Sequence, residues 1–256
     1  FFLTSFMVFI MEVSESGITL TSSSFTPSSF NQRDMVTTLI SCVLPDKISL
    51  PIIIIAAFTF SLVFFIFKYY SYQMKFKKKL LQGTLIKRYK RFFVDIKHQN
   101  RTIIAHCPNS GSMLGLLKAG NKVWFSESNN PKRKLKYTLQ IIEVDSKLVG
   151  INTHLTNKII LESLKEKKIQ DLSKFTEIKP ETKFSKNTRF DFLISNNKEK
   201  CFLEVKNVTL VRKTNTAEFP DAITTRGTKH LKELIEAKKM GYQSYLLFLI
   251  QREDCK

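Results

Sequence analysis

Two stretches, TRFDFLI at residues 188–194 and CFLEVKNVTLV at residues 201–211, decide the fold class of this 256-residue chain. Both are rich in aromatic and β-branched residues, which favour β-strands. The six residues between them, SNNKEK at 195–200, carry side chains typical of a turn. We therefore expect a β-hairpin at the centre of this part of the chain.

The hairpin is expected to bring three charged side chains to one face. Residues i and i+2 of a strand point to the same side, so Glu204 and Lys206 share a face. With a turn centred between Asn197 and Lys198, Asp191 lies opposite Glu204 and projects to that same face. The pattern predicts that Asp191, Glu204 and Lys206 converge.

Two carboxylates beside a lysine are the groups that metal-assisted phosphodiester hydrolysis requires. Mg²⁺ typically binds one or two carboxylates together with substrate phosphate and water. We take Asp191 and Glu204 as candidate ligands of Mg²⁺ or Mn²⁺, Lys206 as their partner, and Glu162 as a further acid on a preceding helix. The alternative is a surface hairpin with a cross-strand salt bridge, because the pattern is short.

The flanking segments predict a mixed α/β domain. Residues 158–168 and 228–240 have the periodicity of amphipathic helices, and the second is expected to end at Gly241. The apolar run at 244–250 is typical of a buried strand. The expected order of elements is α-β-β-α-β.

A second module precedes this domain in the chain. Short β-branched and aromatic segments predict a small β-barrel of the OB type. We expect the longest segment, 81–97, to be one bent strand. The other predicted strands cover residues 101–107, 122–126, 137–144 and 148–152.

The charge of the chain indicates a polyanionic partner. It contains 41 Lys+Arg against 22 Asp+Glu, a formal net charge of +19. Three of the basic and four of the acidic side chains lie in residues 1–73, which leaves 38 and 18 in the remainder. Such an excess favours polyanions through counterion release. We expect DNA or a single-stranded nucleic acid as the partner, with a merely solvated basic surface as the alternative.

Basic and aromatic side chains interleave along the predicted barrel, as they do in grooves that bind single strands. Strand alternation points some of the aromatic residues inward, so part of the pattern can instead belong to the core. His230 is interpreted as a packing or surface histidine. The residues expected to contact nucleic acid are Lys87, Arg88, Tyr89, Lys90, Arg91, Asn109, Lys132, Arg133, Lys134, Arg226 and Lys229.

Residues 1–73 differ sharply from the rest of the chain. They begin with Phe1, carry almost no charge and include the uncharged apolar stretch 51–67, which is just long enough to be a membrane span. One interpretation is a membrane anchor, which would add the membrane as a partner. The other, favoured by the composition change at Met74, is read-through upstream of a start there. The four cysteines form no CxxC pair and fit a reducing compartment, so we expect a cytoplasmic protein.

Seven strings, in the same order, resemble the sugar fermentation stimulation protein family. They are GTLIKRYKRFFVDI (83–96), AHCPNSGSM (105–113), NNPKRKLKYT (129–138), GINT (150–153), TRFDFLI (188–194), CFLEVKNVTL (201–210) and FPDAITTRGTKHLKEL (219–234). The resemblance implies an N-terminal OB-like domain and a restriction-endonuclease-like domain of the PD-(D/E)xK type. It also implies DNA binding with little sequence preference and a regulatory link to sugar-utilisation genes.

The resemblance also assigns residues by position and indicates the domain limits. Asp191, Glu204 and Lys206 match the nuclease-like core, and Glu162 is a weaker match for the helical acid. Members of the family usually begin near the position of Met74 and continue past the position of the last residue. We therefore expect an extension at 1–73 that belongs to no domain, an OB-like domain at 74–152, and a nuclease-like α/β domain at 153–256 that is truncated at its C-terminal end.

Overall fold

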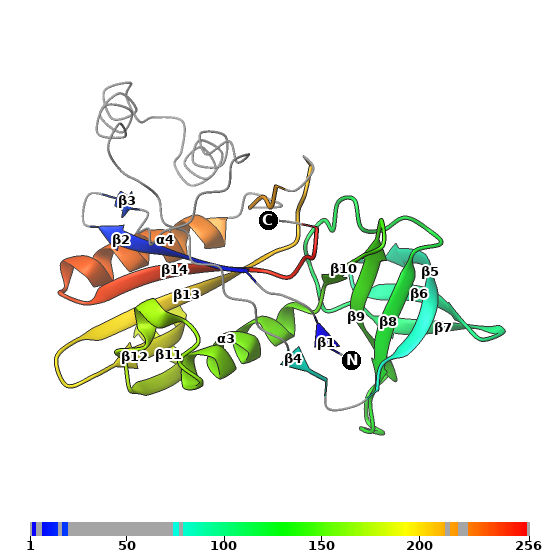
Figure 1. Ribbon diagram of the computed structural model, residues 1–256, viewed down its shortest axis with the longest axis horizontal. Coiled ribbons are helices and arrows are strands. Elements are labelled where there is room, and N and C mark those ends of the chain that lie inside the picture. Colours follow the sequence, from blue (N-terminus) through cyan, green and yellow to red (C-terminus); the bar gives the residue numbers. More distant parts are fainter. Residues whose placement is uncertain are drawn as a thin grey trace.

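The computed structural model describes residues 2–3, 7–14, 17–19, 74–76, 79–212, 216–219 and 225–254. Figure 1 shows a small β-barrel beside a larger α/β domain, with helix α3 beginning next to the barrel and running away from it. The candidate membrane span at 51–67 lies outside the described residues. Within the described ranges, no helix is long and apolar enough to cross a membrane.

The barrel is a closed ring of five strands. Its order is β9-β7-β6-β5-β8, and β8 pairs with β9 to close the ring, while β10 extends β9 at the margin. Its core contains Leu85, Phe125 and Ile142, each with at most 1% exposure. The strands are β5 (Leu81–Tyr89), β6 (Phe93–His98), β7 (Arg101–His106), β8 (Lys122–Glu127), β9 (Tyr137–Val144) and β10 (Lys147–Gly150).

The prediction of a single bent strand over 81–97 is wrong, because this segment is a hairpin of β5 and β6. The chain reverses at Lys90 and Arg91, which have positive φ angles of 45° and 61°. Neither residue is one of the usual turn formers, so the sequence carries no turn signal here. The Arg88 guanidinium stabilises the reversal by donating from Nε to the carbonyl of Arg91 over 2.7 Å.

The second domain has a six-stranded sheet in the order β11-β12-β13-β14-β2-β3. Strands β13 and β14 are parallel and are connected through α4, whereas the other neighbours are antiparallel. A separate pair joins β1 (Phe2–Leu3) to β4 (Met74–Lys75). The elements are β2 (Met7–Ser14), β3 (Gly17–Thr19), the 3₁₀ turns η1 (Thr153–Leu155) and η2 (Gln170–Leu172), α3 (Thr156–Lys165), β11 (Glu177–Ser185), β12 (Thr188–Ser195), β13 (Lys200–Val208), α4 (Thr225–Lys239) and β14 (Gln243–Ile250).

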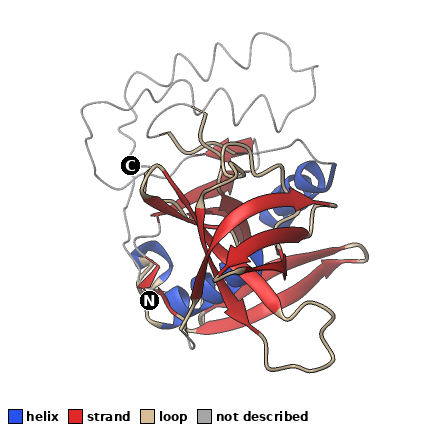
Figure 2. Cartoon of the chain, turned by 90° about the vertical axis from the view of Figure 1, so that its right-hand side faces the viewer, coloured by secondary structure: helices blue, strands red, loops and turns tan. Residues whose placement is uncertain are grey.

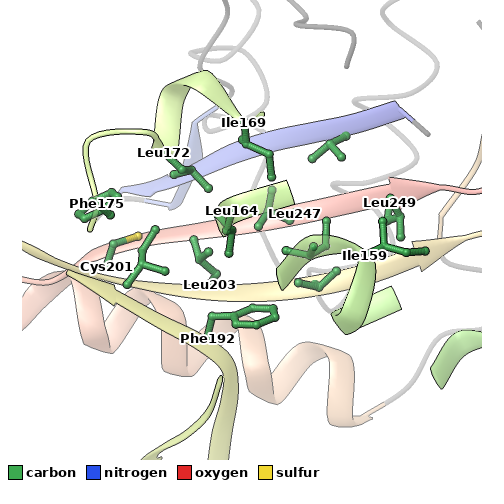
Figure 3. Close-up of a cluster of buried hydrophobic side chains, with 14 of the residues drawn as sticks. Ile159, Leu164, Ile169, Leu172, Phe175, Phe192, Cys201, Leu203, Leu247 and Leu249 are labelled. Atoms are coloured by element: carbon green, nitrogen blue, oxygen red, sulfur yellow. The ribbon is translucent and has the colours of Figure 1, made fainter. Parts of the chain in front are cut away.

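Helices cover both faces of this sheet. Figure 3 shows α3 and η2 packed on one face, where Ile159, Leu164 and Leu172 meet Leu203 and Leu247. On the other face α4 buries Leu231 and Leu234 against Phe202 and Phe248. Burial on both faces explains why β14 is a nearly continuous apolar run and why β13 is apolar without alternation from Cys201 to Leu203.

Strand β11 was not expected from the sequence. Its segment, EIKPETKFS, contains a proline and mostly polar residues, which weaken a strand signal. It lies at the edge of the sheet and pairs only with β12 in the described structure. Proline and lysine at such an edge discourage pairing with other chains, which accounts for the unusual composition.

The expectation that residues 1–73 lie wholly outside the domains is wrong for Met7–Ser14. This segment forms β2 and pairs antiparallel with β14, from Tyr245 opposite Glu12 to Ile250 opposite Met7. Val13 is fully buried, and the Lys238 ammonium lies 3.0 Å from the Glu12 carboxylate. Because β2 buries side chains on both of its faces, its sequence lacks the alternation that marks a strand.

The two domains are joined by hydrogen bonds as well as by the chain. The Gly150 N–H at the end of β10 donates to the Gln251 carbonyl over 2.8 Å, and Val149 bridges Arg252. Arg252 is 5% exposed and donates to the Thr209 carbonyl over 2.6 Å. Figure 2 shows the barrel in front of the α/β domain from this side. The contacts of Val149 and Gly150 thus link the margin of the barrel to the chain segment that follows β14.

Candidate functional site

The hairpin of β12 and β13 has the register that the sequence predicts. Ser195 pairs with Lys200 and the pairing continues to Phe192 opposite Leu203. The backbone ladder ends there, one residue before Asp191 and Glu204 would face each other. At that point the Val205 N–H donates to Oδ2 of Asp191 over 2.7 Å. A side-chain carboxylate thus takes the place of the next backbone acceptor.

Asp191 is held at this position from two sides. Besides the bond from Val205, its Oδ1 accepts a hydrogen bond from Nδ2 of Asn157, at the start of α3, over 2.7 Å. Burial, together with the negative charge of Glu204, raises the pKa of Asp191 to about 6. The carboxylate is therefore costly to ionise, and a bound cation would lower that cost.

Glu204 is 4% exposed and its two oxygens differ. Oε1 accepts a hydrogen bond from the Lys206 ammonium over 2.6 Å and is hydrogen-bonded to Nδ1 of His230 over 2.5 Å. Among the described residues, Oε2 has no hydrogen-bond partner. Although burial raises the pKa of Glu204, the His230 hydrogen bond and the Lys206 charge outweigh it and lower the pKa overall. A buried oxygen of an ionised carboxylate that lacks a hydrogen-bond partner favours the binding of a cation electrostatically.

His230 belongs to this cluster, although the sequence does not show it. It lies on α4, is 8% exposed and contacts Glu204, so it does not simply pack or lie at the surface. His230 and Glu204 are 26 residues apart in the chain, and no local pattern in the sequence indicates that their side chains meet. Arg226 lies one helical turn earlier, at i−4, which places it on the same side of α4.

The helical residue that contacts Asp191 is Asn157. The role of Glu162 as a further acid of the site stays a prediction. Glu162 is exposed and lies five residues further along α3, which is about 140° around the helix axis. Asn157 gives a poor signal in the sequence, because an amide at a helix start is usually a cap. The side chains that meet in the structure are Asp191, Glu204, Lys206, Asn157 and His230.

Two of the residues expected to contact nucleic acid hold a loop instead of lying free on the surface. The Arg88 guanidinium donates to the carbonyls of Asn109, at 2.7 Å, and Gly111, at 3.0 Å. The Asn109 side chain is 5% exposed and accepts from the Gly111 N–H over 2.8 Å. The phosphate contacts expected of Arg88 and Asn109 stay predictions, but their observed contacts are with the protein.

The remaining expected residues present their charges outward. Lys90 and Arg91 are exposed at the β5–β6 turn, and three consecutive cations are exposed in the β8–β9 loop. Lys87 lies 5.6 Å from the ring of Tyr89, which stacks on Phe93. At the start of α4 the Lys229 ammonium donates to the Asn187 carbonyl over 3.1 Å. The exposed cations are Lys87, Lys90, Arg91, Lys132, Arg133, Lys134, Arg226 and Lys229.

These features define a protein class in which an OB-type barrel is joined to an α/β domain that carries a buried carboxylate–lysine cluster. Family models agree with this. A model described as "SfsA N-terminal OB domain" matches residues 86–151, and one described as "Sugar fermentation stimulation protein RE domain" matches residues 154–256. The chain belongs to the sugar fermentation stimulation protein family.

Several relatives are similar over most of the chain. A sugar fermentation stimulation protein homolog of Pelagibacter ubique is 59% identical over 180 residues, which cover 70% of this chain and 78% of the relative. The homolog of Caulobacter vibrioides is 45% identical over 185 residues, 72% of this chain and 77% of the relative. The solved structure of Pyrococcus furiosus SfsA in complex with Ca²⁺ has a TM-score of 0.60 and 26% identity, covering 67% of this chain and 72% of that chain.

Proposed function

We propose that this protein binds DNA with little sequence preference and serves as a regulator of sugar-utilisation genes. The observation that carries the first part is the exposed positive charge on the barrel. The β5–β6 turn and the β8–β9 loop present Lys90, Arg91, Lys132, Arg133 and Lys134 to solvent. Exposed lysines and arginines bind the phosphates of DNA whatever its base sequence, which fits binding without base readout. The regulatory part rests on the family alone.

Location and domain limits follow from more modest observations. Cys107 and Cys201 are free thiols, which fits the reducing cytoplasm that we propose. We place the domain boundary between Asn152 and Thr153, because the barrel's last strand ends at Gly150 and the first 3₁₀ turn of the second domain begins at Thr153.

A second candidate function is divalent-cation-dependent hydrolysis of phosphodiesters at a site of the PD-(D/E)xK type. The observation that favours it is the pair of adjacent carboxylates with opposite pKa shifts. Asp191 is costly to ionise beside Glu204, while Glu204 stays ionised with a buried oxygen lacking a partner among the described residues. The Lys206 ammonium lies 2.6 Å from Glu204, and the lysine side chain is 18% exposed, so the cluster is close to the surface.

The donor set fits a hard divalent cation. No cluster of three or more His, Cys, Asp or Glu side chains suited to a metal occurs among the described residues, whereas Mg²⁺ sites often use only one or two carboxylates. Asp191 and Oε2 of Glu204 would hold the ion, and the Ca²⁺ bound to the Pyrococcus furiosus relative supports a divalent cation. Such an ion polarises a phosphoryl oxygen and activates water. Asn157 and His230 would keep the two carboxylates in place.

Removing the charge of the β8–β9 loop tests the DNA-binding proposal. We expect the triple substitution Lys132→Ala, Arg133→Ala and Lys134→Ala to weaken DNA binding and to make log Kd depend less steeply on log salt. The slope should fall by about one for each phosphate that the variant no longer binds, so by about three. Fluorescence anisotropy of the full chain with labelled duplex DNA, titrated at several salt concentrations, measures it.

A matched control removes the same charge elsewhere. Lys165, Lys167 and Lys168 are exposed at the end of α3 that lies away from the barrel. Their triple alanine variant should keep nearly the wild-type slope. Equal decreases in both variants would mean that DNA responds to net charge alone and that the barrel surface has no special part in binding.

A further inference from the structure

Three aromatic rings from separate segments form a row on the barrel side of the molecule. Phe92, in the β5–β6 turn, stacks on His106 at the end of β7, with ring centroids 6.2 Å apart and planes inclined by 25°. His106 in turn lies 6.3 Å from His154 of η1, at 39°. We call these three residues the aromatic ladder.

The aromatic ladder is held in place by the backbone. The carbonyl of Phe92 accepts from the Cys107 N–H over 2.8 Å, which ties the turn to the end of β7. The Pro108 carbonyl accepts from the Thr153 hydroxyl over 2.7 Å, which ties that segment to η1. The His154 N–H donates to the side chain of Asn152 over 3.0 Å. These bonds place the three chain segments that carry the rings next to one another in the absence of a ligand.

The ladder faces solvent among positive charges. Phe92 is 43% exposed, a large fraction for a phenylalanine, and His154 is also exposed. Arg91 precedes Phe92 and is exposed. Burial, with the positive charge of Arg133 nearby, lowers the pKa of His106, which favours the neutral form of its ring.

We propose that the aromatic ladder is a platform on which unpaired bases of a single-stranded nucleic acid stack, while the neighbouring arginines bind its phosphates. Stacking on aromatic rings beside cations is how proteins bind single strands without reading sequence. A duplex keeps its base faces covered by its own neighbours, so the exposed rings suit unpaired bases. The inference rests on the proposed nucleic-acid binding and specifies single-stranded nucleic acid as the ligand.

The aromatic ladder is close in the chain to the helix that supports the carboxylate cluster. His154 lies in η1, and α3 begins directly after η1 and carries Asn157, the residue whose side chain holds Asp191.

The test compares oligonucleotides that carry the same phosphates with and without bases. We would titrate the full chain with labelled oligo(dT), oligo(rU) and an abasic oligomer, each of about 12 nucleotides, a length that covers one OB-sized site. The wild type should bind oligo(dT) about tenfold more tightly than the abasic oligomer, and Phe92→Ala should remove that preference while leaving abasic binding unchanged. His154→Ala should reduce the preference for oligo(dT) in part. The oligo(rU) arm tells whether RNA or DNA is bound more tightly.

Met240→Ala is the matched control, because Met240 is a large apolar side chain, 66% exposed, at the end of α4 and away from the ladder. Met240→Ala should change neither the affinity for oligo(dT) nor the affinity for the abasic oligomer. Equal wild-type affinity for oligo(dT) and the abasic oligomer, or an unchanged preference in Phe92→Ala, would overturn the stacking platform while leaving DNA binding intact. Absence of binding to all three probes would also overturn the platform, and a labelled duplex titrated in parallel shows whether the proposed DNA binding fails with it.

Discussion

Replacing Asp191 with asparagine should abolish the proposed divalent-cation-dependent cleavage of DNA. The asparagine cannot carry the negative charge that a cation requires, so cleavage with Mg²⁺ or Mn²⁺ should fall by about 100-fold or more. Incubation of the full chain with labelled DNA and the cation, followed by gel analysis, measures this decrease. Asp145→Asn, in the exposed β9–β10 turn, is the control and should cleave like the wild type.

Asp191→Asn should also change how the stability of the protein depends on pH and on divalent cations, which can be measured without any cleavage. The pKa of Asp191 is raised to about 6 in the folded protein, so the folded state binds more protons than the unfolded state between about pH 4 and 6. Relative to Asp191→Asn, the wild type should therefore lose stability as the pH rises through this window. A divalent cation favours ionised Asp191, so at pH 7 it should stabilise the wild type and not the variant. Identical pH profiles and identical cation effects in both proteins would contradict a cation site at Asp191.

Replacing Lys206 with methionine should destabilise the fold by about 3 kcal/mol at pH 7. The substitution leaves a buried carboxylate with one partner fewer, and breaking a buried ion pair from one side typically costs this much. The free energy of unfolding in urea measures the change. Because Glu204 has a lowered pKa, its pairing stabilises the protein above the unfolded pKa, and this stability is lost as the pH falls. The difference between variant and wild type should therefore shrink in acid.

An exposed ion pair serves as the comparison. The Lys122 ammonium lies 3.1 Å from the Glu143 carboxylate, and the lysine side chain is 57% exposed. Such pairs contribute about 0–1 kcal/mol, so Lys122→Met should have a small effect at any pH. If Lys206→Met were equally mild, Glu204 would not be held as a buried charge, and its place in a cation site would lose its support.

Local patterns in the sequence predict most of the elements that surround the site. The turn at 195–200 and the strand alternation around it are enough to predict the register that brings Asp191 near Glu204. A small β-barrel is also predictable, although the predicted strand at 81–97 is a hairpin and the one at 148–152 corresponds to β10, outside the closed ring. The hairpin gives no signal because positive φ angles at Lys90 and Arg91 replace the usual glycine or asparagine. The turn is stabilised by Arg88, through a side-chain hydrogen bond that no local pattern records.

Long-range contacts account for what the sequence does not reveal. His230 and Asn157 reach the carboxylates from two helices on opposite faces of the sheet, and neither side chain looks unusual in its own segment. Strand β2 was missed because its apolar residues are buried on both faces and because it pairs with β14 from the far end of the chain. The aromatic ladder combines residues of three segments, of which only the first was near the expected binding residues.

The central claim is that this protein binds nucleic acid through the positive charge of its surface. The most direct test is the affinity of the full chain for DNA, measured by fluorescence anisotropy between about 50 and 200 mM salt. A protein that neutralises about six or more phosphates should lose at least about 10³-fold in affinity over this range. We predict a decrease of that size for this chain. An affinity that hardly changes with salt would contradict the electrostatic account of its function.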